Sequence, residues 1–177
     1  MSGDASDAFE DFVHDRSAYL FQLALLLAGR NQADAQDLLQ VALERAWRRR
    51  RAIARDDNPE AYVRRALVNA SIDRWRWLRR RDECSLEAAG PGPAGGDPAS
   101  LVARRDELLR ALPPRQRAVL VLRYWEDMPE AEVTRVLGCN VGTVKSQASR
   151  GLARLRELGR HRAGPAVRQA EVGGSDD

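Results

Sequence analysis

The stretch from residue 113 to residue 155 limits what this 177-residue chain can fold into more than any other part. It holds two short helix-like segments around Gly138, and glycine supplies the positive φ that a tight turn between helices needs. Asn140 is a good N-cap for a second helix that begins at about residue 141. Along that helix, apolar residues recur at steps of three and four, as expected for one buried face. These residues are Val141, Val144, Ala148, Leu152 and Leu155.

A compact polar and basic face lies on another side of the same predicted helix. It consists of Lys145, Ser146, Ser149 and Arg150. A helix that is held down by an apolar stripe, with such a face outward, can enter the major groove of DNA. We therefore predict a helix-turn-helix. A further helix over residues 115–125 is predicted to precede it, and its candidates for burial are Val119, Leu122, Ala118 and Trp125.

Three longer helices are predicted in the first half of the chain. Residues 6–28 show such a broad apolar stripe that this helix should be buried on most sides, and Gly29 ends it. A second helix is predicted over residues 33–51. A third helix should cover residues 59–81, with Asn58 as its N-cap. The inward-facing candidates on the second helix are Leu38, Leu39, Ala42, Leu43 and Ala46.

The third of these helices has an unusual composition, because tryptophans alternate with many arginines. The residues concerned are Arg64, Arg65, Arg74, Trp75, Arg76, Trp77, Arg79, Arg80 and Arg81. Aromatic rings stack on unpaired bases and guanidinium groups hold the backbone, so this pattern is typical of proteins that bind single-stranded nucleic acid. The alternative is that each tryptophan belongs to the core and the arginines face solvent. The residues alone leave both interpretations open.

The region between the two halves is dense in Gly, Pro and Ala over residues 83–100, which is typical of a linker. About 17 such residues can extend to roughly 55–60 Å. The last residues, 161–177, show no periodicity and are predicted to be disordered. We therefore predict an all-α protein with two small helical domains joined by a flexible linker. The N-terminal one, a bundle of three to four helices, covers residues 6–82, and the four-helix domain with the helix-turn-helix covers residues 101–160.

The chain offers little material for catalysis or metal binding. Cys84 and Cys139 are far apart, and His14 and His161 are the only histidines, so no zinc site and no nucleophile–base pair is expected. We predict that the protein is not an enzyme and needs no metal or cofactor. The start of the chain lacks the features of a signal peptide, and its longest apolar run, residues 18–28, is too short to span a membrane. A cytoplasmic protein is therefore expected.

Three segments, in this order along the chain, resemble the sigma-70 family of RNA polymerase sigma factors, in its small extracytoplasmic-function (ECF) group. The most specific is LPPRQRAVLVLRYWEDMPEAEVTRVLGCNVGTVKSQASRGLARLRE, residues 112–157, which is similar to region 4 of that family. The segment DAQDLLQVALERAW, residues 34–47, resembles the core-binding regions 2.1–2.2. The segment at residues 58–81 resembles the promoter-melting regions 2.3–2.4. Asp127 stands where the family commonly has Gly.

The resemblance assigns three sets of residues. Contacts with the clamp helices of the polymerase β′ subunit are implied for Asp37, Leu38, Gln40, Leu43, Arg45 and Trp47. Reading and melting of the −10 element are implied for Asn69, Ser71, Asp73, Arg74, Trp75 and Arg76, with Arg79 and Arg80 added as backbone contacts. Reading of the −35 duplex is implied for Val144, Lys145, Ser146, Ser149 and Arg150.

By this resemblance the chain is expected to be a promoter-specificity subunit that acts as a monomer. Its expected partners are core RNA polymerase, through the β′ clamp helices and the β flap, promoter DNA, and an anti-sigma factor that sequesters both domains. The alternative is a dimeric helix-turn-helix regulator that binds a palindrome without polymerase and uses its N-terminal domain to sense a signal. Co-purification with core polymerase distinguishes the two.

Overall fold

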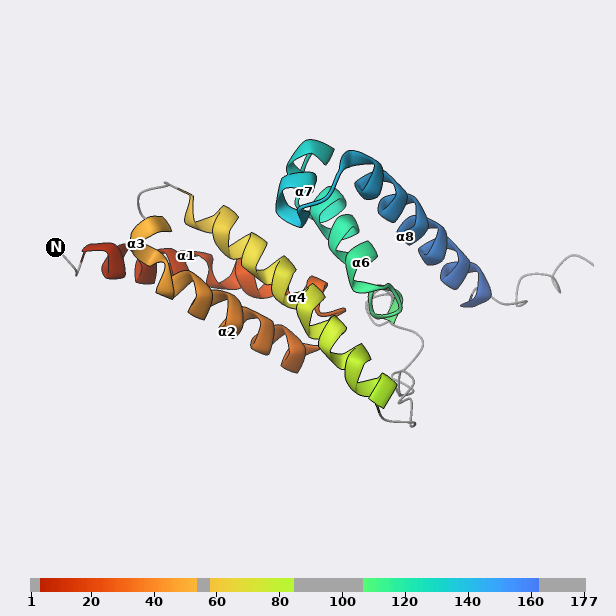
Figure 1. The fold of residues 1–177 in the computed structure, drawn as a ribbon, viewed down its shortest axis with the longest axis horizontal. Helices are drawn as coiled ribbons and strands as arrows, with labels where there is room; N and C mark the ends of the chain where they lie inside the picture. Colours follow the sequence, from red (N-terminus) through yellow and green to blue (C-terminus); the bar gives the residue numbers. More distant parts are fainter. Residues whose placement is uncertain (1–3, 54–57, 85–106, 163–177) are drawn as a thin grey trace, which may run out of the picture.

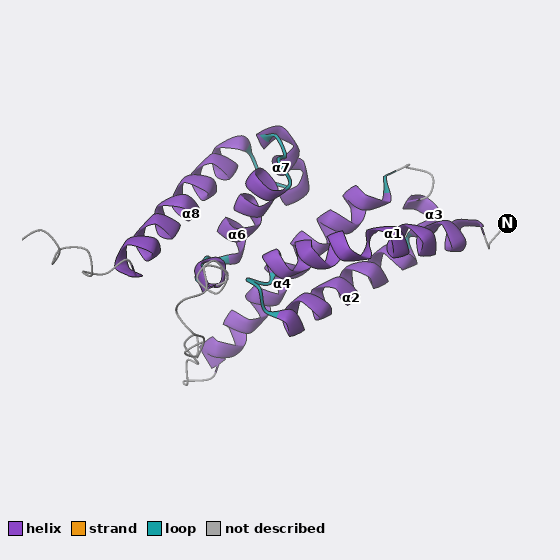
Figure 2. Cartoon of the chain, turned by 180° about the vertical axis from the view of Figure 1, so that it is seen from behind, coloured by secondary structure: helices purple, strands orange, loops and turns teal. Residues whose placement is uncertain are grey.

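The computed structural model describes residues 4–53, 58–84 and 107–162, and within these ranges every regular element is a helix (Figure 1; Figure 2). The elements are α1 (Asp4–Leu27), α2 (Gln32–Arg48), α3 (Arg50–Ile53), α4 (Pro59–Cys84), α6 (Pro114–Leu120), η1 (Val121–Trp125), α7 (Glu130–Leu137) and α8 (Val141–Arg162). The all-α prediction is confirmed. Helices α4 and α8 reach slightly into the ranges predicted as linker and tail. The rest of those ranges, and the predicted helical residues 101–106, lie outside the described part.

Helix α1 ends in the way that its glycine predicts. Gly29 has φ of 64°, and the N–H of Arg30 donates to the carbonyl of Leu25 at 2.7 Å. Together with the bond from Gly29 N–H to Leu26 O at 3.2 Å, this is a Schellman C-cap. The cap leaves the carbonyl of Leu27 for a partner from elsewhere in the chain.

The second predicted helix is broken near its end. Asn31 caps α2 by accepting from the N–H of Asp34 at 3.2 Å, but Arg49 leaves the helical conformation and the short helix α3 follows. The guanidinium of Arg50 lies 4.1 Å from the centre of the Trp47 ring and donates to the Trp47 carbonyl at 2.9 Å. The expectation of one continuous helix to residue 51 is therefore wrong, because the chain turns here to bury Ile53 against the core.

The N-terminal domain packs α1, α2 and α4 around fully buried aliphatic side chains. The largest of these are Leu20, Leu23, Val63, Leu67 and Val68. In the C-terminal domain, α6, η1, α7 and α8 enclose a second set. Its largest members are Val119, Leu122, Val133 and Val144. Fully burying an aliphatic side chain of this size contributes about 1.5–3 kcal/mol, so each set contributes substantially to the stability of its domain.

The two domains pack directly on one another, an arrangement that we call the closed arrangement. Helix α4 contacts α6 and α7, and α1 contacts α6 and η1. The buried residues of both domains form one continuous hydrophobic cluster. Figure 1 shows α6 and α7 lying along α4, with α8 on the far side of them. The sequence predicted two separate domains on a linker and did not predict this contact.

Arg117 supplies the polar centre of the contact between the domains. Its side chain is almost completely buried, and its Nη1 donates to the carbonyl of Leu27 at 2.9 Å, at the C-terminal end of α1. Its Nη2 donates to the carbonyls of Arg110 and Leu112 at 3.2 and 3.0 Å. Burial lowers the pKa of Arg117 to about 10. The guanidinium thus caps the last turn of α1, where the helix dipole favours a cation.

A local π-helix changes which residues the C-terminal domain buries. In η1 the N–H of Glu126 donates to the carbonyl of Val121 at 3.1 Å, five residues back. The wider turn shifts the register, so Trp125 is 54% exposed. The prediction that Trp125 is buried is therefore wrong, whereas Ala118, Val119 and Leu122 are buried as predicted.

Candidate nucleic-acid and polymerase interfaces

The helix-turn-helix has the geometry that the sequence predicted. Gly138 adopts φ of 61° and ψ of 40°, and the N–H of Cys139 donates to the carbonyl of Thr134 at 3.2 Å. The side chain of Asn140 accepts from the N–H of Thr143 at 2.7 Å, which caps the first turn of α8. The turn and the cap together set the angle between α7 and α8, and this angle determines which face of α8 is outward.

The outward face of α8 carries most of the predicted recognition residues. Lys145, Ser149 and Arg150 are exposed, and the ammonium of Lys145 lies 3.7 Å from the carboxylate of Glu130. Ser146 is half-buried and donates to the carbonyl of Thr143 at 3.0 Å. Val144 is fully buried and packs in the domain core, so the expectation that its side chain touches DNA is corrected. Its contribution is to hold α8 in place.

The residues predicted to melt the −10 element have different environments along α4. Asp73, Arg76 and Arg80 are exposed, whereas Asn69 and Trp75 are half-buried. Ser71 is buried and donates to the carbonyl of Val68 at 2.8 Å, so its predicted contact with DNA is corrected as well. The backbone of Arg79 is helical. Trp77 is 49% exposed, which favours the solvent-facing interpretation of this tryptophan over the core one.

Arg74 is held by the neighbouring helix. Its Nη2 lies 2.5 Å from a carboxylate oxygen of Asp34, and its Nη1 lies 3.3 Å from Asp37. These ion pairs tie α4 to α2. Arg74 therefore has a role in positioning the helix, and Asp37, predicted to contact polymerase, is engaged in the same cluster.

A basic pocket that the sequence did not predict lies between the end of α2 and the first half of α4. Its lining residues are Arg45, Arg48, Arg49, Tyr62, Arg65, Ala66 and Asn69, around a volume of about 520 Å³. Within the described residues this lining includes no carboxylate. Guanidinium groups gathered around an aromatic ring suit a phosphate backbone with its bases. The run of arginines at residues 48–51 was a signal, but the sequence could not show that Arg65 lies opposite it.

The residues predicted to contact polymerase do not all lie on one surface. Gln40, Leu43 and Trp47 line one apolar groove of about 800 Å³ between α1 and α2, together with Phe9 and Leu39. The rings of Phe9 and Trp47 lie 5.8 Å apart in an edge-to-face arrangement. This groove has the shape and the apolar lining that receive an amphipathic helix.

The remaining members of that set lie away from the groove. Leu38 is largely buried and reaches the surface only at the floor of another pocket, which it lines with Asp37 and Trp77. Arg45 lines the basic pocket and also the neighbouring pocket that contains Asp37 and Trp77. The structure thus assigns Arg45 to the arginine cluster and leaves Gln40, Leu43 and Trp47 together.

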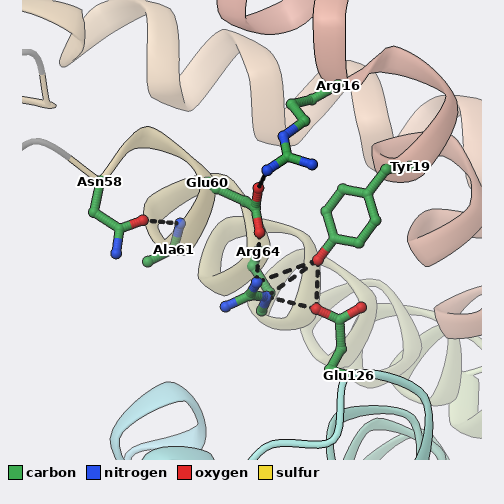
Figure 3. Close-up of polar contacts among 7 residues, drawn as sticks. All are labelled: Arg16, Tyr19, Asn58, Glu60, Ala61, Arg64 and Glu126. Atoms are coloured by element: carbon green, nitrogen blue, oxygen red, sulfur yellow. Dashed lines mark hydrogen bonds and ion pairs between the residues drawn. The ribbon is translucent and has the colours of Figure 1, made fainter.

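A polar network connects α1 and α4 of the N-terminal domain with the end of η1 in the C-terminal domain (Figure 3). The carboxylate of Glu126, at the end of η1, lies 2.8 Å from Nε of Arg64 on α4 and accepts a short hydrogen bond from the hydroxyl of Tyr19 on α1. Glu60 binds the same guanidinium at 2.8 Å and also pairs with Arg16 at 2.8 Å. Burial raises the pKa of Tyr19 to about 12, and the hydrogen bond to Glu126 acts in the same direction.

Stability should therefore fall between pH 10 and pH 12. In this range the unfolded chain loses the Tyr19 proton while the folded chain keeps it, so the folded state is fully favoured below pH 10 and loses this advantage as pH rises to about 12. A difference titration of tyrosinate absorbance between the wild type and Tyr19→Phe should place the Tyr19 midpoint near 12. A midpoint near 10 would show that the network does not enclose the hydroxyl.

The described residues hold no group of three or more His, Cys, Asp or Glu side chains that could bind a metal ion. Among the same residues, no helix is both long and apolar enough to cross a membrane.

The chain is similar to proteins of one family. Residues 7–81 match Sigma-70 region 2, and residues 106–155 match Sigma-70, region 4. The RNA polymerase sigma-E factor of Streptomyces avermitilis is 40% identical over 152 residues, which cover 84% of this chain and 83% of that one. The ECF RNA polymerase sigma factor SigM of Mycobacterium tuberculosis is 32% identical over 152 residues, covering 85% and 76%.

Two solved structures have the same architecture. The sigma factor RpoE of Bartonella quintana, solved in complex with the anti-sigma factor NepR, has a TM-score of 0.66 at 25% identity and covers 86% of this chain and 97% of its own. CnrH in complex with the cytosolic domain of CnrY has a TM-score of 0.57 at 25% identity, covering 90% and 94%. With two family regions in order and relatives that extend over most of its length, the chain belongs to the sigma-70 family of RNA polymerase sigma factors, in its ECF group.

Proposed function

We propose that this sigma factor directs core RNA polymerase to specific promoters, reading a −35 duplex with its C-terminal domain and melting a −10 element with its N-terminal domain. The observation that carries the proposal is the presence of two different nucleic-acid faces on one chain. One is the exposed recognition face of α8. The other is the basic pocket between α2 and α4, with Arg76, Trp77 and Arg80 exposed further along α4.

The C-terminal domain, over residues 101–160, would be positioned by phosphate contacts and would read base edges with Lys145 and Arg150. The N-terminal domain, over residues 6–82, would hold the displaced strand. Its backbone would pass the arginines of the basic pocket while unpaired bases stack on aromatic rings. Unpairing costs a few kcal/mol per base, and stacking on aromatic rings contributes about 1–3 kcal/mol per base. Stacking would therefore offset much of the free-energy cost of melting once the protein is bound to the promoter.

The apolar groove between α1 and α2 is the proposed binding site for the β′ clamp helices. Gln40, Leu43 and Trp47 would contact them, because these side chains line the groove and are at least partly exposed. A second apolar groove of about 340 Å³ is lined mainly by the C-terminal domain, including Trp125 and Leu152, and also by Leu26 of α1. We assign this one to the β flap or to an anti-sigma factor. The relatives solved with anti-sigma factors support a regulator of that kind.

On this proposal the protein acts in the cytoplasm as a monomer, with no catalysis of its own and no cofactor. Run-off transcription with core polymerase on genomic DNA tests it, since promoter-specific transcripts should require the added chain. Co-purification with core polymerase is expected as well. Tight, specific promoter binding by the purified chain alone, without polymerase and without transcripts, would instead indicate the helix-turn-helix regulator.

Arg150 should read sequence rather than only supply charge. Arg150→Ala in the holoenzyme is expected to reduce discrimination at one −35 base pair by about 1–3 kcal/mol, because the exposed guanidinium can bind a guanine edge through two hydrogen bonds. Competition binding with promoters mutated one base pair at a time measures this. Arg80→Ala is the control, and it should weaken binding to all promoter sequences equally. If Arg150→Ala reduced affinity equally for every sequence, Arg150 would not read bases.

A further inference from the structure

A cavity of about 220 Å³ lies where the two domains meet, and we call it the interdomain cavity. Helix α4 lines one side of it with Asn69 and Arg76, which share one face of the helix. Helix α6 contributes Arg115, and α8 contributes Gln147. Small-molecule sites occur preferentially at domain interfaces, where a few polar groups converge on a concave space. The interdomain cavity has this form, and neither domain provides it alone.

The amides of Asn69 and Gln147 supply directional hydrogen-bonding groups. Both residues are half-buried, and within the described part of the chain neither side chain has a hydrogen-bond partner. A side-chain amide offers a donor and an acceptor side by side. This pair matches the N6 and N7 edge of adenine, which asparagine and glutamine bind through two hydrogen bonds, whereas the corresponding edge of guanine prefers arginine or lysine.

Two guanidinium groups give the interdomain cavity an excess of positive charge. Arg115 is exposed, and among the described residues no carboxylate pairs with it. Arg76 lies 3.5 Å from Asp73, but both side chains are about half exposed, and surface pairs of this kind contribute little. Both guanidinium groups are therefore available to a phosphate at the solvent side of the cavity. The carboxylate of Asp73 suits a ribose hydroxyl.

The apolar lining and the volume limit the size of the ligand. Ile72 and Val119 are buried, and with the half-buried Leu137 they offer aliphatic surface against which a planar ring can pack. A volume of about 220 Å³ is less than the roughly 300–1,000 Å³ of sites that enclose drug-sized ligands. The interdomain cavity can therefore enclose a base and leave the phosphate at its rim.

We propose that the interdomain cavity is a binding site for an adenine nucleotide. Asn69 and Gln147 bind the edge of the base, and Arg76 and Arg115 bind the phosphate. Because both domains contribute side chains, the nucleotide binds when they are packed together, and its binding stabilises that packing. Asn69 and Arg76 also belong to the set assigned to the −10 element, so nucleotide and DNA strand would compete for them. This competition rests on the proposed function, whereas the binding site itself does not.

The test uses the full-length chain and adenosine 5′-monophosphate (AMP). Calorimetric titration measures the affinity, and alkylation of Cys139 by N-ethylmaleimide reports the place of binding, because Cys139 lines the same cavity. AMP should bind and should slow the alkylation of Cys139, measured by mass spectrometry of the peptide that contains it. GMP and adenosine should each bind about tenfold more weakly, since one lacks the matching base edge and the other lacks the phosphate. Inorganic phosphate should leave the alkylation rate unchanged.

Two substitutions assign the contacts. Gln147→Leu removes an amide but keeps the approximate size of the side chain, and Arg115→Met removes a guanidinium; each should weaken AMP binding about tenfold. Arg115→Met should leave the affinity for adenosine unchanged. Arg154→Met is the matched control, because Arg154 is an exposed arginine of the same domain outside the described lining of the cavity. It should not change the affinity for AMP, and circular dichroism checks that each variant keeps its helix content.

Absence of AMP binding to the wild type would overturn the proposal. Binding that left the alkylation of Cys139 unchanged would overturn it as well, since AMP would then occupy the basic pocket or another surface. Equal affinities for AMP and GMP would refute the assignment of the base. Run-off transcription tests the proposed function separately, because the calorimetry and alkylation experiments need neither polymerase nor DNA.

Discussion

Arg117→Met is expected to lower the free energy of unfolding by about 3 kcal/mol. It leaves two buried carbonyl oxygens and one partly buried carbonyl oxygen without their donor, at about 1–3 kcal/mol for each buried group, partly offset by relaxation. Arg117 donates to Leu27, Arg110 and Leu112 from a site that is only 9% exposed. Methionine keeps the length of the side chain and fills most of the space. The substitution thus removes the donors rather than the packing. Urea unfolding followed by circular dichroism gives the free energy.

Arg115→Met is the control for this experiment, because Arg115 is exposed on the same helix, two residues away. Surface substitutions of this kind usually stay within about 0.5 kcal/mol. An equal, small effect at both positions would contradict the capping role of Arg117. It would mean that the desolvation cost of the buried guanidinium cancels its hydrogen bonds, as occurs at some buried charges that are replaced by apolar groups.

Replacing the four arginines of the basic pocket by glutamine should reduce affinity for single-stranded DNA about 100-fold at low salt. The substitutions are Arg45→Gln, Arg48→Gln, Arg49→Gln and Arg65→Gln. Each phosphate contact contributes about 0.7 to the slope of log affinity against log salt, so the slope should become shallower by about 3. Anisotropy titrations between roughly 50 and 200 mM salt measure both quantities.

The matched control replaces the same four residues by lysine. Lysine keeps the charge but not the planar fork, so the salt slope should persist while absolute affinity falls less. If the glutamine variant kept the wild-type slope, the phosphates would pass elsewhere on the domain. The basic pocket would then be a solvated helix end, as the arginine run at residues 48–51 is in many proteins.

Local signals in the sequence were sufficient for most helix boundaries. Gly29, Asn58, Gly138 and Asn140 each act at a helix end through their own backbone or side chain, and the structure confirms all four. Such signals depend on contacts within three or four residues. They can be read without knowing the fold.

Signals that depend on distant partners were missed. Periodicity shows that a face is apolar but not what covers it, so the packing of the C-terminal domain on α4 could not be derived. Arg117 and Glu126 look like ordinary surface charges in the sequence, because their partners in the other domain include Leu27 and Tyr19, which lie 90 and 107 residues away. The resemblance to a family likewise assigned roles by position, and it could not show that the side chains of Ser71 and Val144 are buried.

Gly29 shows how closely the two domains constrain each other's evolution. A Cβ atom there would come within 2.9 Å of Cα of Arg110 and of Nη1 of Arg117, both in the C-terminal domain. Its φ of 64° alone would still admit an asparagine. In the closed arrangement, however, the C-terminal domain further restricts which side chains this position can carry. In a related protein whose domains do not pack in this way, this constraint would be absent. Larger residues at the Gly29 position would then indicate that the closed arrangement has been lost.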